Sequence, residues 1–173
     1  MANFYTDTSF ILPLTEAEAK SVETAFNMIN DHHFEVMFND IWDSDERVSD
    51  FLLGVEKENG ADVAKIMADH LNKCDDKSFV STDGSVQMIE EGLLFTTEDQ
   101  ILHIENTANF VQTVLAHFNK EQAVGFEVAF TQSGDEVGGF GGCAAFITKD
   151  DVEFMSTSSW ILQKEYEFDK KGR

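Results

Sequence analysis

Residues 86–97 read VQMIEEGLLFTT, and this stretch decides the expected fold. Two runs of strand-forming side chains, Val86–Glu90 and Leu93–Thr97, flank the dipeptide Glu91-Gly92. A two-residue hairpin turn requires a positive φ, which glycine adopts without strain. The stretch therefore predicts an antiparallel hairpin, and it favours a sheet whose strands are neighbours in the chain.

Other stretches share the period-two alternation or the short apolar runs of strands. In Phe34–Phe38, for example, Phe34, Val36 and Phe38 lie on one side. Pro13 places the first strand of the chain at a sheet edge or a strand end. The further predicted strands are Ser9–Leu14, Phe34–Phe38, Val124–Thr131 and Cys143–Thr148.

Helices are indicated by apolar side chains at spacings of three and four. Thr15 and Glu18 form a capping box, which opens a helix that ends near Asn30. The clearest stripe follows Asp62, from Val63 to Cys74. The other predicted helices are Asp43–Glu58, which Gly54 interrupts, Ile104–Phe118 and Ser156–Lys164.

The strands occur in hairpins and outnumber the helices that parallel crossovers would need. We therefore expect an α+β two-layer sandwich, with a mainly antiparallel sheet and helices on one face. Residues 1–173 form a single domain in this interpretation, and residues 165–173 form a frayed tail. An internal strand–helix–strand duplication is also suggested, because Val22–Asn30 before Phe34–Phe38 resembles Val111–Asn119 before Phe126–Phe130. The alternative is that any helix followed by a Phe- and Val-rich strand looks alike.

Composition excludes several classes of protein. The chain has 173 residues, 42% of them apolar, so a packed core is expected despite the charge. The N-terminus lacks a basic segment and a long apolar run, and no stretch approaches the length of a membrane span. Cys74 and Cys143 are expected to be reduced, buried thiols. We therefore expect a cytoplasmic protein.

Charge is the most unusual property of the chain. Its 33 Asp and Glu residues against 12 Lys and Arg give a net charge of −21. Direct binding to nucleic acid or to anionic membranes requires clustered Lys and Arg, so both are disfavoured. Residues 31–99 hold 18 acidic and 5 basic residues, a local net charge of −13.

An acidic surface of this kind can dock into a basic groove that otherwise holds nucleic acid. The alternative is a solvated face that only maintains solubility. The residues predicted to contact such a partner are Asp40, Asp43, Asp45, Glu46, Asp50, Glu56, Glu58, Asp62, Asp69, Asp75, Asp76, Glu90 and Glu91.

Motifs for metals and cofactors are weak. Asp31-His32-His33 matches a signature of metal phosphoesterases, but further Asp and His ligands are not evident. Five glycines lie within Ser133–Cys143, and Gly139–Ala144 fits a G-x-G-x-x-A pattern. That pattern must open a helix to bind a dinucleotide, whereas a strand is expected after it. We expect no metal and no cofactor, and we interpret the glycines as a hairpin loop.

A catalytic interpretation depends on three side chains. Cys143 lies beside the glycines, and a neighbouring histidine or helix N-terminus would have to activate it as a nucleophile. Glu35 and Glu127 occupy equivalent positions in the suggested repeats, which could bring two carboxylates together. Otherwise they are outward residues of two strands. The enzyme hypothesis therefore predicts a pocket beside Gly138–Cys143.

From Val124 to Trp160 the sequence resembles a family of small, uncharacterised bacterial and phage proteins. The similar features are the strand Gly125–Phe130, a Phe-Gly-Gly loop, the strand Ala145–Thr148 and a terminal helix that carries Trp160. The resemblance extends to the helix around Phe110 and to the initial FILPLTEAEA. It implies a single domain and favours a phage or mobile-element origin. It transfers no catalytic residue, because it implies no activity.

Three hypotheses about function follow. The first is a non-enzymatic acidic interaction protein, a nucleic-acid mimic that inhibits a nucleic-acid-binding complex in the manner of anti-restriction or anti-CRISPR proteins. The second is a small enzyme with a pocket beside Gly138–Cys143. The third is a structural or dimerising protein.

Overall fold

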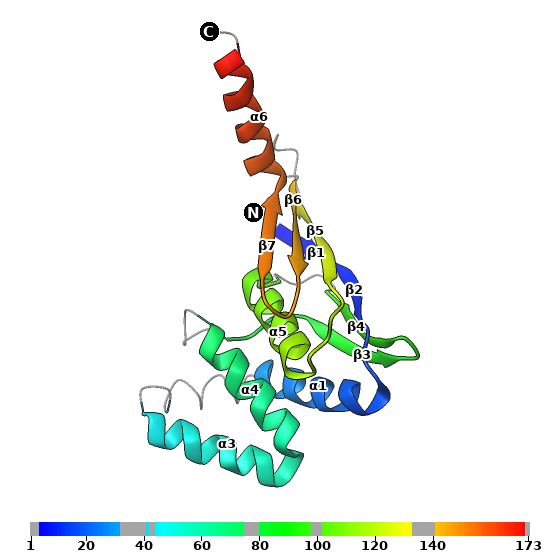
Figure 1. The fold of residues 1–173 in the computed structure, drawn as a ribbon, viewed down its shortest axis with the longest axis vertical. Coiled ribbons are helices and arrows are strands. Elements are labelled where there is room, and N and C mark those ends of the chain that lie inside the picture. Colours follow the sequence, from blue (N-terminus) through cyan, green and yellow to red (C-terminus); the bar gives the residue numbers. More distant parts are fainter. Residues whose placement is uncertain are drawn as a thin grey trace.

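The computed structural model describes residues 4–31, 41, 44–74, 80–97, 102–132 and 141–171 (Figure 1). The predicted α+β architecture is confirmed. In chain order the elements are β1 (Phe4–Asp7), β2 (Ser9–Leu12), α1 (Glu16–Ile29), α3 (Asp45–Asn59), α4 (Ala61–Lys73), β3 (Ser85–Ile89), β4 (Gly92–Thr96), α5 (Ile104–His117), β5 (Val124–Gln132), β6 (Gly141–Ile147), β7 (Val152–Ser156) and α6 (Thr157–Lys171).

The strands form two antiparallel sheets. We name them sheet A, with the strand order β1-β5-β6-β7, and sheet B, with the order β2-β4-β3. Every strand pair in both sheets is antiparallel, as the hairpin pattern predicted. The sequence indicated one sheet, whereas in the structure the chain passes from one sheet to the other through a single residue.

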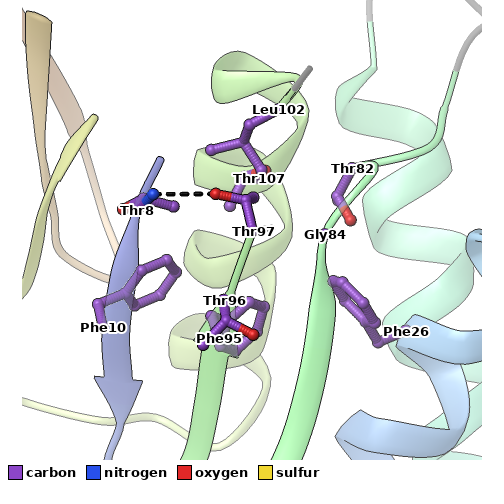
Figure 2. A pocket seen from close by; sticks show the side chains of 10 residues that line it. All are labelled: Thr8, Phe10, Phe26, Thr82, Gly84, Phe95, Thr96, Thr97, Leu102 and Thr107. Atoms are coloured by element: carbon purple, nitrogen blue, oxygen red, sulfur yellow. Dashed lines mark hydrogen bonds between the residues drawn. The ribbon is translucent and has the colours of Figure 1, made fainter. Parts of the chain in front are cut away.

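That residue is Thr8, which lies between β1 of sheet A and β2 of sheet B. Its backbone N–H donates to Thr97 Oγ1 at 2.9 Å, and its carbonyl oxygen accepts from Thr97 N at 3.2 Å (Figure 2). Its hydroxyl donates to the carbonyl oxygen of Glu127 on β5 at 2.6 Å. The two hydrogen bonds with Thr97 reach the end of sheet B, and the hydrogen bond to Glu127 reaches sheet A, so Thr8 joins the two sheets.

A group of aromatic rings connects the sheets to the helices. Phe10 of β2 stacks on Phe95 of sheet B, with ring centroids 4.7 Å apart, and on Phe126 of sheet A at 4.6 Å. Phe26 of α1 packs edge-on against Phe95 and against Phe110 of α5. The crevice that Phe10, Phe26 and Phe95 share with neighbouring threonines has no room for a water molecule (Figure 2). The two sheets therefore share one dry core.

The helices pack in order from the sheets outward. α1 contacts sheet B, and α5 contacts β6 and β7 of sheet A. α4 packs against both α1 and α5, and α3 packs against α4. Val55 is the only fully buried residue of α3, which makes α3 the outermost helix of this layer.

Local signals at helix ends are confirmed. Thr15 and Glu18 form the predicted capping box, with Thr15 N donating to Glu18 Oε2 at 2.8 Å. Asn30 ends α1, and its Nδ2 donates to the carbonyl oxygen of Phe26 at 2.9 Å. Asn30 Oδ1 accepts from the backbone N–H groups of Thr82 and Asp83 at 2.9 and 3.0 Å. This side chain holds the segment before β3 against the end of α1.

The predicted hairpin is confirmed, with its turn moved by one residue. Ile89 pairs with Gly92, so the loop is Glu90–Glu91 rather than Glu91-Gly92. Gly92 is the first residue of β4 and has a φ of 140°. A Cβ there would lie 2.3 Å from the carbonyl oxygen of Leu12. The glycine is required by the close approach of β2 as well as by its backbone angle.

Other boundaries differ from the sequence prediction. β1 and β7 were not predicted, and α6 continues to Lys171, past the predicted end at Lys164 and through most of the expected frayed tail. Phe34–Phe38, the second strand of the first suggested repeat, lies outside the described residues. The internal duplication therefore stays a prediction. None of the helices in the described part combines the length and apolarity of a membrane span.

Candidate functional site

The predicted acidic residues divide among three places. Asp40, Asp43, Asp75 and Asp76 lie outside the described residues. Five others lie on α3, two lie on α4, and Glu90 and Glu91 form the β3–β4 turn. Figure 1 shows that turn on the side of the molecule opposite to α3. The predicted acidic residues that are described therefore do not share one face.

Two of these carboxylates have basic partners. Asp62 Oδ1 lies 3.0 Å from His117 Nε2 of α5, and Asp69 pairs with Lys65 one turn earlier on α4. Both pairs lie within the helical layer: one connects α4 to α5, and the other supports α4 itself. Such contacts within the helical layer give Asp62 and Asp69 a structural role.

The α3 carboxylates are different. All five are exposed, and none has an ion pair or a side-chain hydrogen bond with any part of the chain that the structure describes. We call them the α3 carboxylates: Asp45, Glu46, Asp50, Glu56 and Glu58. The same helix carries two basic residues, so its net charge is −3.

The α3 carboxylates share the outer face of the helix with an exposed leucine. The inward side of α3 is formed by Val48, Phe51, Leu52 and Val55, which pack on the core. At about 100° per residue, the carboxylates fall on the remaining arc of the helix. Leu53 falls near the middle of that arc, and 51% of its surface is exposed. The outer face of α3 therefore carries the apolar Leu53 among carboxylates, of which Glu46, Asp50 and Glu56 lie nearest to it in angle, with the basic Lys57 one turn further along.

Local structure explains only part of this group. Asp45 and Glu46 lie in the first turn, where negative charge is favourable beside the helix dipole. Glu46 and Asp50 are four residues apart, a spacing at which like charges repel. Glu56 and Glu58 lie near the C-terminal end, where negative charge is unfavourable. Three of the five thus have no stabilising role within α3.

A second candidate surface is the face of sheet A that no described helix covers. It forms a groove of about 1270 Å³. Small residues form its floor, among them Gly125 and Ala129 of β5 and Ala144 of β6. Phe146 and Met155 project from it with exposed fractions of 54% and 57%. This open face borders Gly141–Cys143, the described part of the stretch beside which the enzyme hypothesis predicted a pocket.

The catalytic side chains of that hypothesis do not converge. Glu127 and Cys143 both border the groove, but Glu127 pairs with Ala144 and Cys143 pairs with Val128. Because side chains alternate along a strand, Glu127 projects into the groove and Cys143 toward the core. Burial raises the pKa of the Cys143 thiol, which keeps it protonated and a poor nucleophile. The groove therefore lacks an activated thiol beside a carboxylate.

The glycine cluster lies partly within a strand. Gly141 and Gly142 begin β6, so the G-x-G-x-x-A pattern leads into a strand, as the sequence indicated. A Cβ on Gly142 would lie 2.9 Å from the carbonyl oxygen of Val128, so this glycine permits close strand pairing. The remaining glycines of the cluster, Gly134, Gly138 and Gly139, lie outside the described residues.

Metal-binding residues do not assemble in the described part of the chain, where no three His, Cys, Asp or Glu side chains are grouped to hold an ion. Asp31 follows Asn30, the C-cap of α1, and His32, His33 and Glu35 lie outside the described residues. His70 is buried on α4, and its Nε2 lies 2.9 Å from the carbonyl oxygen of Val80.

The role predicted for the α3 carboxylates stays a prediction. The sequence did not predict the exposure of Leu53, and the enzyme hypothesis predicted a pocket beside Gly138–Cys143 without predicting an uncovered sheet face. A signal for the sheet face exists, since small residues alternate on two strands, at Gly125 and Ala129 and at Gly142 and Ala144. Such alternation reduces the number of large side chains on one face of a sheet, where here Glu127 and Phe146 also lie.

No protein-family model, curated protein or solved structure matches this chain. The resemblance of Val124–Trp160 to small bacterial and phage proteins stays a prediction. The function is therefore argued from geometry and charge.

Proposed function

We propose that the protein is a non-catalytic acidic binding protein, which docks the outer face of α3 onto a basic surface of another protein. In its more specific form, that basic surface is one that otherwise holds nucleic acid. The observation that carries the proposal is the group of exposed α3 carboxylates without a partner among the described residues, on the helix face that also carries the exposed Leu53.

Simple solubility accounts poorly for this arrangement. Glu56 and Glu58 each oppose the helix dipole, at a cost of about 0.3–1 kcal/mol in surface positions. The pair Glu46 and Asp50 adds a repulsion of about 0.2–0.5 kcal/mol. An exposed leucine at the centre contributes nothing to solubility. A central apolar contact within a charged rim is, however, the usual anatomy of a protein interface.

The charge on α3 is lower than that of duplex DNA. The carboxylates extend from Asp45 to Glu58, which is about 20 Å along the helix axis. A duplex carries about twelve phosphate charges over that length, whereas α3 carries five acidic and two basic residues. α3 therefore matches part of a nucleic-acid site, and Leu53 supplies an apolar contact that a phosphate backbone lacks.

Capture from a lysate of the cell that naturally makes the protein tests the proposal, with three baits compared by quantitative mass spectrometry. The first bait is the unaltered chain. The second carries Glu56→Gln and Glu58→Gln on α3. The third carries Glu90→Gln and Glu91→Gln in the hairpin turn, so that it loses the same charge from another exposed place.

We expect the unaltered chain and the hairpin variant to retain the same basic proteins at low salt, and the α3 variant to lose them. Duplex DNA should displace those proteins, and moderate salt should weaken their retention steeply. Capture of no basic protein, or equal loss in both variants, would overturn the proposal. Retention that duplex DNA does not displace would leave α3 docking supported and refute the nucleic-acid-mimic form.

A further inference from the structure

The open face of sheet A carries three carboxylates and no basic side chain among the lining residues that the structure describes. They are Asp7 on β1, Glu127 on β5 and Glu153 on β7, and all three are exposed. None of the three forms an ion pair with a described residue. The negative charge of this face is therefore not neutralised within the described part of the molecule.

The register of sheet A places these carboxylates on one diagonal. Asp7 pairs with the residue two positions along β5 from Glu127. Glu153 pairs with Phe146, which lies two positions along β6 from the partner of Glu127, toward the opposite end of the sheet. Strands lie about 4.8 Å apart and rise about 3.4 Å per residue, so the diagonal from Asp7 to Glu153 is about 20 Å long.

The rest of this face is suited to an apolar contact. Phe146 and Met155 lie beside the diagonal and are 54% and 57% exposed. The small residues Gly125 and Ala144 allow the backbone of an occupant to approach the sheet closely. The groove of about 1270 Å³ is larger than the roughly 300–1000 Å³ of most small-molecule sites. These properties favour a segment of a macromolecule that carries both apolar and charged side chains.

Charge argues against several kinds of occupant. A second copy of the chain has a net charge of −21. Its α6, which extends away from sheet A (Figure 1), carries three basic and three acidic residues and therefore offers no net positive charge. Nucleic acid and anionic membranes have the same sign of charge as this face, and like charges across an interface disfavour binding. The complementary occupant is a positively charged segment of another protein.

We propose that the open face of sheet A is a second docking site, which binds a basic amphipathic helix of another protein. A helix of about 14 residues is about 20 Å long, which matches the diagonal. Its Lys and Arg side chains pair with Asp7, Glu127 and Glu153, and its apolar side chains contact Phe146 and Met155. Binding of an amphipathic helix in a groove is a common mode of recognition. This site is distinct from α3, which packs on α4 and away from sheet A (Figure 1).

The probe for the first test is a synthetic amphipathic helix of leucine, alanine and lysine, about 14 residues long. Its affinity is measured by fluorescence anisotropy at physiological salt, where distant charges are screened. Glu127→Gln with Glu153→Gln gives the sheet variant, and the α3 and hairpin variants defined above lose the same charge elsewhere. A peptide of the same composition with a scrambled pattern is the second control.

We expect the sheet variant to bind the peptide about 2- to 30-fold more weakly, because it lacks two exposed ion pairs. The α3 and hairpin variants should bind like the unaltered chain, and the scrambled peptide should bind more weakly than the amphipathic one. Absence of binding, or equal weakening in all three variants, would overturn the proposal. Weakening confined to the α3 variant would also overturn it, because the peptide would then bind α3.

The second test concerns the apolar contact and the alternative of a second copy. Phe146→Ser should weaken peptide binding about 3- to 10-fold, because part of an aromatic side chain is no longer buried. Leu53→Ser is the matched control on α3, since Leu53 is 51% exposed, and it should leave the affinity unchanged. Equal affinities for these two variants would refute the apolar contact.

Sedimentation of the unaltered chain without peptide should give a monomer. A dimer that Phe146→Ser dissociates would show that a second copy covers this face, and it would overturn the proposal. None of these outcomes decides the proposed function, because the capture experiment compares changes at other residues.

Discussion

Gly54 lies in the interior of α3, and its replacement by alanine should stabilise the protein. A Cβ built at Gly54 has no atom within 4 Å, so alanine neither clashes nor gains packing. The effect is then that of the backbone alone. Alanine is about 0.8–1.0 kcal/mol more favourable than glycine inside a helix, because glycine loses more conformational freedom on folding.

Gly60 provides a matched control between α3 and α4. A Cβ there also has no atom within 4 Å, but the φ of Gly60 is +98°. With a ψ of 164°, Gly60 lies in a region that is essentially restricted to glycine, so alanine there is strained by about 1–3 kcal/mol. Gly54→Ala and Gly60→Ala therefore differ in backbone conformation and not in packing, and they should change stability in opposite directions.

Thermal and denaturant unfolding measure both effects. For a domain of this size, Gly54→Ala should raise the melting temperature by about 2–4 °C, and Gly60→Ala should lower it. Because α3 has a single buried residue, it can open locally, so amide hydrogen exchange of α3 should also slow in Gly54→Ala. A neutral or destabilising Gly54→Ala, with unchanged exchange, would refute the assignment of Gly54 to a regular helix.

Two further predictions concern buried side chains. The Thr113 hydroxyl has no hydrogen-bond partner in the described part of the chain, so Thr113→Val should stabilise the protein by about 1–2 kcal/mol in denaturant unfolding. Thr107→Val is its control, because the Thr107 hydroxyl donates to His103 O at 2.9 Å, and the loss of this hydrogen bond should destabilise the protein. Changes of the same sign in the free energy of unfolding of both variants would contradict the reasoning. The raised pKa of Cys143 leaves less thiolate at a given pH. In a Cys74→Ser chain, iodoacetamide should therefore alkylate Cys143 more slowly in the native protein than in the denatured protein. The rise of the alkylation rate with pH should also occur at higher pH in the native protein, and equal rate–pH profiles for the two states would refute this.

Much of the fold could be predicted because its signals are local. The capping box at Thr15 and Glu18 and the apolar stripe after Asp62 lie within single helices. The hairpin around Gly92 was predicted for the same reason, although its turn moved by one residue. The positive φ of Gly92 and its lack of a Cβ allow β2 to approach closely, and this contact is not evident from the hairpin sequence.

The features that were missed depend on distant contacts. The two sheets are connected by hydrogen bonds from Thr8 to Thr97 and to Glu127, which are 89 and 119 residues away. β1 and β7 are short edge strands, each pairing with one neighbour, so their alternation is weak. The acidic segment is evident in the sequence, but the separation of α3 from the Glu90–Glu91 turn follows from tertiary packing.

The most direct test of the proposed function is the quantity of basic protein retained by two equally charged variants. Glu56→Gln with Glu58→Gln changes α3, and Glu90→Gln with Glu91→Gln changes the hairpin turn. The account predicts that the α3 variant loses the captured protein, whereas the hairpin variant retains it like the unaltered chain. Equal loss from the two variants would show that binding depends on net charge, and full retention by both would show that neither pair is needed. Either result would contradict a specific role for α3.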